Sequence, residues 1–86
     1  MSPVAAGMVH VFPNPVNDVL SVRIESDDVQ GLGVLNVTGT LVAQPILSFE
    51  GGRASGEVIM RDLPPGVYFV RVQVEGNLVV RKIIRN

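Results

Sequence analysis

The chain has 86 residues, a formal charge of −1 at pH 7, one histidine and no cysteine. A chain of this length forms one small domain and buries only about 60–65% of the surface that it exposes when unfolded. The composition excludes disulfides, cysteine-ligated zinc and thiol nucleophiles, and the near-neutral charge gives no overall attraction to nucleic acid or to an anionic membrane.

The first eight residues differ in character from the rest of the chain. They are mostly small, include Pro3, and lack the basic and apolar regions of a signal peptide. We therefore expect residues 1–8 to be a linker or a remnant of cloning, and residues 9–86 to form the domain. If the protein is secreted, its export signal would lie upstream in a longer parent chain.

Short runs of alternating apolar and polar residues predict strands in the first two thirds of the chain. Pro13 and Pro15 end the first run, and Pro45 places the fourth at a sheet edge or at a bulge. Asn36 to Gly39 suit a type I turn, and residues 50–53 suit a flexible hairpin loop. The five expected strands are Val9–Phe12, Val19–Glu25, Gln30–Leu35, Leu41–Leu47 and Gly56–Met60.

The C-terminal third predicts a β-hairpin. In residues 67–74 every second side chain from Tyr68 onward is apolar, so one face is expected in the core and the face of Phe69, Arg71 and Gln73 outside. Gly76-Asn77 can adopt the positive φ that a short hairpin turn needs. Residues 78–84 would then return antiparallel to the first strand.

About seven strands with turns every 8–12 residues predict an all-β fold, a small Ig-like antiparallel β-sandwich with essentially no helix. Tyr68 follows a Pro-Gly corner, where sandwiches of this type carry a tyrosine whose hydroxyl group bonds to upstream backbone. We therefore expect Tyr68 to be a structural anchor. The expected core consists of Leu20, Val22, Ile24, Val34, Leu41, Tyr68, Val70 and Val72.

The sequence lacks a residue pattern typical of catalysis. A nucleophile or base must face an orienting partner, whereas nearly all eight acidic residues fall in predicted turns or at outward strand positions. His10 has no second histidine beside it, so we expect it at the surface or partly buried. We predict that the domain is not an enzyme and holds no metal or other cofactor.

Three weaker patterns are not favoured as binding or membrane segments. Asn17-Asp18 and Asp27-Asp28 would form a calcium site only if their loops met, and their spacing is not that of an EF-hand. Gly31-x-Gly33 lacks the third glycine and the helix of a phosphate-binding loop. Residues 29–49 carry no charge, but three glycines and Pro45 argue against a transmembrane segment. Few aromatic residues argue against nucleic-acid binding.

Four segments, in order along the chain, resemble the motifs of one family. Residues 11–20 resemble a YPNP…D.L opening with Phe12 in place of tyrosine, and residues 36–42 resemble a D..GK.V block with Thr40 where lysine or arginine is common. Residues 63–72 and 81–85 resemble the two motifs at the end of the family's pattern. Together they resemble the type A C-terminal sorting domain of the type IX (Por) secretion system of Bacteroidetes. The matching motif residues are Phe12, Pro13, Asn14, Pro15, Gly39, Gly66 and Tyr68.

The resemblance implies that the domain is a sorting signal carried by a cargo protein. Such cargo crosses the inner membrane with an ordinary signal peptide and passes through the periplasm. The folded domain is recognised there by an outer-membrane barrel protein that acts as a shuttle, and the cargo then passes through the translocon. A cell-surface sortase usually removes the domain and joins the cargo to anionic lipopolysaccharide. The cargo therefore ends at the cell surface or outside the cell.

The end of the chain is the candidate recognition element. A terminal strand at a sheet edge can be extended by a partner strand, and its three cations would steer it toward an acidic site. The alternative, purely structural interpretation is that these charges deter aggregation at an exposed edge. Alternatives for the whole domain are a generic Ig-like adhesion or spacer module, or an uncleaved surface adaptor subunit of the machinery. The candidate residues are Arg81, Lys82, Ile83, Ile84, Arg85 and Asn86.

Overall fold

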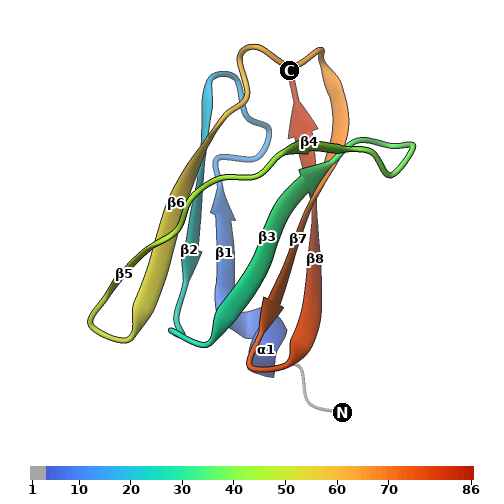
Figure 1. The fold of residues 1–86 in the computed structure, drawn as a ribbon. Coiled ribbons are helices and arrows are strands. Elements are labelled where there is room, and N and C mark those ends of the chain that lie inside the picture. Colours follow the sequence, from blue (N-terminus) through green and yellow to red (C-terminus); the bar gives the residue numbers. More distant parts are fainter. Residues whose placement is uncertain (1–3) are drawn as a thin grey trace.

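The computed structural model describes residues 4–86, which form two antiparallel sheets of four strands each and one helical turn (Figure 1). The elements are α1 (Val4–Gly7), β1 (Val9–Phe12), β2 (Val19–Ile24), β3 (Val29–Leu35), β4 (Leu41–Ala43), β5 (Ser48–Glu50), β6 (Arg53–Ile59), β7 (Gly66–Val74) and β8 (Asn77–Arg85). Within this part of the chain, no helix has the length and apolar character that crossing a bilayer requires.

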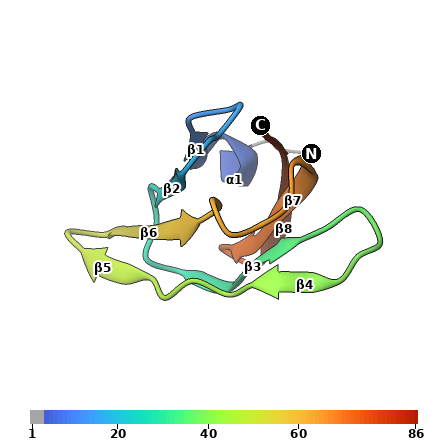
Figure 2. The ribbon, with the colours of Figure 1, turned by 90° about the horizontal axis from the view of Figure 1, so that it is seen from above.

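The order of the strands confirms the Ig-like sandwich. One sheet has the order β1-β2-β6-β5 and the other β4-β3-β7-β8, which is the arrangement of two sheets linked by Greek-key connections that defines this fold. Viewed from above, the sheets form two layers (Figure 2). Each sheet is hydrophobic on one face, and packing the two faces together removes both from water.

The helical turn α1 is an element that the strand pattern did not predict. The linker expected over residues 1–8 falls partly on residues 1–3, which lie outside the described residues. Residues 4–7 form α1, which contacts β1 and β8. Ala5 is buried against the core, and Arg81 donates a hydrogen bond to the carbonyl oxygen of Ala6. A single turn is unstable alone, so these contacts hold it.

The alternation predicted for β2 and β7 is confirmed. Leu20, Val22 and Ile24 are buried, and so are the alternate residues of β7 from Tyr68 to Val74. The core also includes residues from loops and from the last strand, among them Val16, Met60 and Ile83, each 0% exposed. Most of the residues expected in the core are therefore buried, but the expected core omitted the buried residues of the loops and of β8.

Leu41 was wrongly placed in the core. It pairs with Leu35, on the outer face of its sheet, and is 46% exposed. A bulge-like register shift between Val34 and Leu35 changes which residues of β4 face inward. The Leu41 side chain lies over Gly33, where an added Cβ atom would come within 2.7 Å of Leu41 Cδ1.

Only residues 41–43 of the strand predicted over residues 41–47 form a strand, and β5 follows that segment in the opposite sheet, so the described chain has eight strands rather than seven. β4 ends at Ala43, and β5 begins at Ser48 in the opposite sheet. Pro45 has no amide hydrogen to give to a ladder, so the chain leaves the first sheet there. The crossing segment passes close to β6. A Cβ atom added to Gly56 of β6 would lie only 3.2 Å from the carbonyl oxygen of Ile46. The edge position expected from Pro45 is confirmed for β4, and β5 lies at the edge of the other sheet.

Two turns have the residue types that the sequence predicted, and one of them lies one residue earlier than expected. Gly39 donates its amide hydrogen to the Asn36 carbonyl oxygen at 3.0 Å, as in a type I turn. In the last hairpin, Val74 pairs with Asn77, so the turn residues are Glu75 and Gly76, with φ of 51° and 80°. The turn thus lies one residue earlier than expected, and it has the two positive φ angles of a type I′ turn.

Tyr68 forms the predicted corner. Its side chain is only 5% exposed, and its hydroxyl group donates a hydrogen bond to the carbonyl oxygen of Pro64 at 2.5 Å. The bond ties the start of β7 to the loop that leads into it. This contact fixes how the chain crosses from one sheet to the other between β6 and β7.

We expect Tyr68→Phe to lower the free energy of unfolding by about 1–2 kcal/mol, because the Pro64 carbonyl group loses its partner. Tyr68→Ala should cost about 3–5 kcal/mol through the cavity that it leaves. Urea denaturation monitored by circular dichroism measures both values. A Tyr68→Phe variant with the stability of the parent would show that the corner bond contributes nothing.

Candidate recognition site

The candidate residues at the end of the chain lie on the edge strand β8, which pairs with β7 from Gly66↔Arg85 to Val74↔Asn77. Their side chains point to two different sides of the sheet. Ile83 is fully buried, and Arg81 and Arg85 are half-buried beside it. Lys82 and Ile84 are exposed on the outer face. The six residues therefore do not form one continuous surface.

The segment after the two prolines pairs with the end of β8. Val16 donates its amide hydrogen to the Ile84 carbonyl oxygen at 2.8 Å, and Asn86 donates to the Val16 carbonyl oxygen at 3.0 Å. These bonds form a parallel bridge between Val16 and Arg85, and the Val16 side chain is 0% exposed. The end of the edge strand is thus already covered by the protein's own backbone.

The side chain of Asn14 extends this cover by one more pair of bonds. Its Oδ1 atom accepts the amide hydrogen of Ile84 at 3.0 Å, and its Nδ2 atom donates to the Lys82 carbonyl oxygen at 3.1 Å. An amide side chain presents one donor and one acceptor side by side, so it can pair with an edge as a neighbouring strand would. Addition of a partner strand between Lys82 and Asn86, as expected from the sequence, would have to displace these bonds.

The other half of the β8 edge is not paired with a strand, although the helical turn α1 contacts β8. In a two-residue hairpin the pairs alternate between hydrogen-bonded and non-hydrogen-bonded, starting from the bonded pair Val74 and Asn77. The backbone groups of Leu78 and Val80 therefore point away from β7. Within residues 4–86, no hydrogen bond to these groups is present.

The three cations of the C-terminus have different surroundings. Arg81 bonds to the Ala6 carbonyl oxygen, and Arg85 donates to the carbonyl oxygens of Met60 and Arg61 at 2.8 and 3.1 Å. Lys82 forms no side-chain hydrogen bond or ion pair with any described residue. Two of the three cations thus hold the domain together, and Lys82 is the one whose charge is available to a partner.

The acidic and histidine side chains form separate surface pairs. His10 Nε2 lies 2.7 Å from Glu25 Oε2, and Arg61 bonds to Asp18. The hydrogen bond that Arg61 donates to Asp18, reinforced by the charge of the carboxylate, raises the pKa of Arg61, which is charged at any physiological pH in either case. The loops at Asp18 and Asp27 leave opposite ends of β2, so they do not meet as a calcium site requires. Among the described residues, no cluster of three potential metal ligands occurs.

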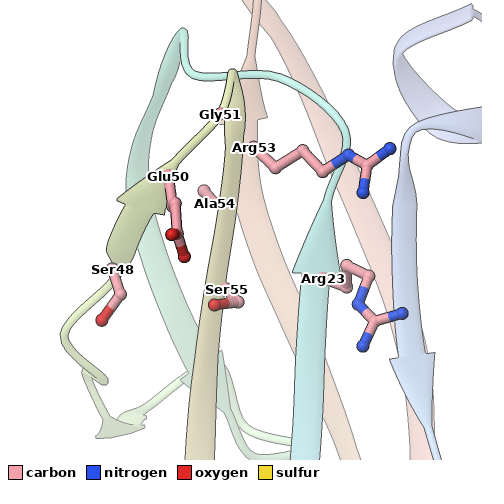
Figure 3. A pocket seen from close by; sticks show the side chains of 7 residues that line it. All are labelled: Arg23, Ser48, Glu50, Gly51, Arg53, Ala54 and Ser55. Atoms are coloured by element: carbon pink, nitrogen blue, oxygen red, sulfur yellow. The ribbon is translucent and has the colours of Figure 1, made fainter.

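A shallow pocket of about 490 Å³ lies on the other sheet and contains none of the candidate residues (Figure 3). The side chains of Arg23 and Arg53 extend to the same side of this pocket, and Glu50 lies across β6 from them. The lining has two serine hydroxyl groups but no histidine, so it holds no pair of nucleophile and imidazole base. Its lining residues are Arg23, Ser48, Glu50, Gly51, Arg53, Ala54 and Ser55.

The sequence indicated the importance of Asn14 without indicating its role. The Pro-Asn-Pro motif was identified through the resemblance, yet its contact with Lys82 and Ile84 spans about 70 residues of sequence, as the separations of 68 and 70 show. Val16 follows two prolines and precedes a polar turn, so no alternation marks it. Its apolar side chain after the motif is the one sequence feature that points to burial.

Comparisons with known proteins agree with the sequence motifs. The family profile described as "Secretion system C-terminal sorting domain" matches residues 10–86. The chain is also similar to Karilysin of Tannerella forsythia, with 31% identity over 81 residues, which is 85% of this chain and 17% of the relative. The chain thus spans about a sixth of the length of that relative. No solved structure shows significant similarity.

We expect Asn14→Ala to lower the free energy of unfolding by about 1–2 kcal/mol, because two hydrogen bonds to the edge of β8 are lost. Asn17→Ala is the matched control, since among residues 4–86 the Asn17 side chain bonds only to the exposed side chain of Asn86. It should change stability by less than about 0.5 kcal/mol. Equal melting temperatures for the two variants would contradict the role of Asn14.

We expect Arg85→Gln and Lys82→Gln to differ, although each removes one positive charge from the same strand. Arg85→Gln leaves two backbone carbonyl groups without their donor and should cost about 1–3 kcal/mol. Lys82→Gln should cost less than about 0.5 kcal/mol. Thermal unfolding of both variants in the same buffer gives the comparison. A loss on Lys82→Gln as large as that on Arg85→Gln would show that the two cations are equivalent.

Proposed function

Because the chain belongs to the secretion system C-terminal sorting domain family, we propose that it is the address of a larger cargo protein that the type IX secretion system exports. The family match over residues 10–86 is the observation that carries this proposal. A domain of this family is a secretion signal and not a catalyst. Its cargo is destined for the cell surface or the extracellular space.

The route follows from the family. The cargo crosses the inner membrane with its own signal peptide, and this domain folds in the periplasm. An outer-membrane shuttle protein then binds the folded domain and delivers the cargo to the translocon. At the cell surface a sortase usually removes a domain of this family. The cargo itself carries whatever enzymatic activity the whole protein has.

The fold supports recognition as a folded surface rather than as a flexible tail. The last residues of the chain are paired on one side with β7 and on the other with Val16. Arg85 is bonded to the backbone after β6. A machine that reads this end of the chain therefore meets a rigid sandwich, and unfolding the domain should abolish recognition.

The test is a reporter with a periplasmic signal peptide, fused in front of residues 1–86 and expressed in a host with an active type IX system. We expect the reporter at the cell surface or in the medium, because the domain supplies the address. The reporter without the domain should stay in the periplasm. A host lacking the translocon should retain the fusion. Immunoblots of the separated periplasm, membranes and medium measure the distribution.

The Tyr68→Ala variant of the fusion adds a control for folding, since it removes the core anchor and changes no residue of β8 itself. It should be retained in the periplasm or degraded. Retention of the folded parent fusion, in a host that exports its own cargo normally, would contradict the proposed function.

A further inference from the structure

The two sheets differ in charge. The described strands of the sheet β4-β3-β7-β8 contain four cations, Arg71, Arg81, Lys82 and Arg85, and no acidic residue. In the other sheet, two arginines are balanced by Glu50 and Glu57. Because the net charge of the chain is −1, this local excess reflects the distribution of charge rather than its total.

The outer face of that sheet brings two of these cations together. Arg71 pairs with Val80, and Phe69 pairs with Lys82, so Arg71 and Lys82 are diagonal neighbours, at a separation of about 7–8 Å that long side chains can span. Neither side chain forms a hydrogen bond or ion pair with a described residue. Two adjacent like charges without an acidic neighbour do not stabilise the sheet, and both are available to an acidic partner.

Apolar side chains surround these two cations. Val80 is 48% exposed, Ile84 is 42% exposed and Leu41 is 46% exposed. Phe69 lies half-buried between the strands. We call the set Leu41, Phe69, Arg71, Val80, Lys82 and Ile84 the basic sheet face. Among the described residues, four of the nine exposed large hydrophobic side chains, counting Leu78, lie on this one surface.

We propose that the basic sheet face docks on an apolar protein surface ringed by carboxylates, carried by the outer-membrane component that recognises the sorting domain. This inference rests on the proposed function and names the surface and the chemistry through which it acts. Buried apolar contacts would supply affinity, and Arg71 and Lys82 would set orientation and speed association with an acidic partner.

The composition of the face favours a protein over an anionic membrane or a nucleic acid. Attraction to an anionic lipid surface is weak for each basic residue and typically uses clusters of about 4–8 of them. This face offers two available cations, Arg71 and Lys82, among apolar side chains. Polyanion binding depends in the same way on many phosphate contacts. An apolar surface with a few cations matches a protein interface better.

The pairing at the end of the β8 edge also favours docking on the basic sheet face over strand addition. The Asn14 and Val16 contacts cover the end of β8, so a partner that approaches there meets no open backbone. The outer face beside it is exposed, and the open edge at Leu78 and Val80 borders it. A partner seated on the face would therefore lie beside these unpaired backbone groups.

The test compares two double variants with the same change in charge. Arg71→Gln with Lys82→Gln alters the basic sheet face, and Arg23→Gln with Arg53→Gln alters the opposite sheet. The probe is the host's purified outer-membrane shuttle protein in detergent, titrated with the domain of residues 1–86. We expect the first variant to bind at least about tenfold more weakly, and the second within about twofold of the parent.

A second pair of variants tests the apolar part without changing charge. Val80→Thr with Ile84→Thr should weaken binding, whereas Phe49→Thr with Ile59→Thr, on exposed residues of the other sheet, should not. Circular dichroism melting identifies folded variants. The charge of Arg71 and Lys82 should also make binding by the parent weaker at high salt.

The outcomes separate this inference from the proposed function. If the parent fusion is not exported and does not bind the shuttle, the proposed function fails. If the parent binds but the variants of the basic sheet face bind equally well, the inference is overturned and the function stands. Equal weakening by both charge variants, or binding to vesicles of anionic lipopolysaccharide without binding to the shuttle protein, overturns it too.

Discussion

The pairing of Val16 with the end of β8 is the contact on which the rest of this small sandwich depends. The connection between β1 and β2 belongs to one sheet, and β8 is the edge of the other. The bonds of Val16 to Ile84 and Asn86 therefore join the two sheets through backbone as well as through the core. In a domain of 86 residues, where buried area is limited, such a link holds the layers in register.

The same contact decides what the end of the chain offers to a partner. An uncovered terminal strand would invite extension by any exposed strand and would be prone to aggregate. Here the backbone at the end is paired, and Arg81 and Arg85 are bonded to carbonyl groups of the domain itself. What is left is the outer face, where Lys82 and Arg71 lie among apolar side chains. We therefore propose that a partner recognises the sorting domain through side chains on a rigid sheet.

Much of the fold could be predicted from local patterns, because a half-buried strand repeats every two residues and turns have strict φ requirements. The inward face of β7, the type I turn at Asn36 and the Tyr68 corner all follow from chemistry within a few residues. The exposure of Leu41 and the early end of its strand at Ala43 do not, since they depend on a register shift and on the crossing to the other sheet that Pro45 favours.

The candidate site was less predictable than the fold. The sequence identified the terminal residues, but in β8 adjacent residues point to opposite faces, and their partners Ala6, Asn14 and Met60 are distant in the chain. Arg71 was predicted to point outward, yet nothing local showed that it would stand beside Lys82. That neighbourhood exists only through the register of the hairpin.

Amide hydrogen exchange of the folded domain measures the central claim, that the end of β8 is closed and its middle is open. The account predicts that the Ile84 and Asn86 amides are protected at least about fivefold more than those of Val80 and Lys82, as a net hydrogen bond of about 1 kcal/mol implies. Exchange of Ile84 and Asn86 as rapid as that of Val80 would contradict it, because the edge would then be open along its whole length.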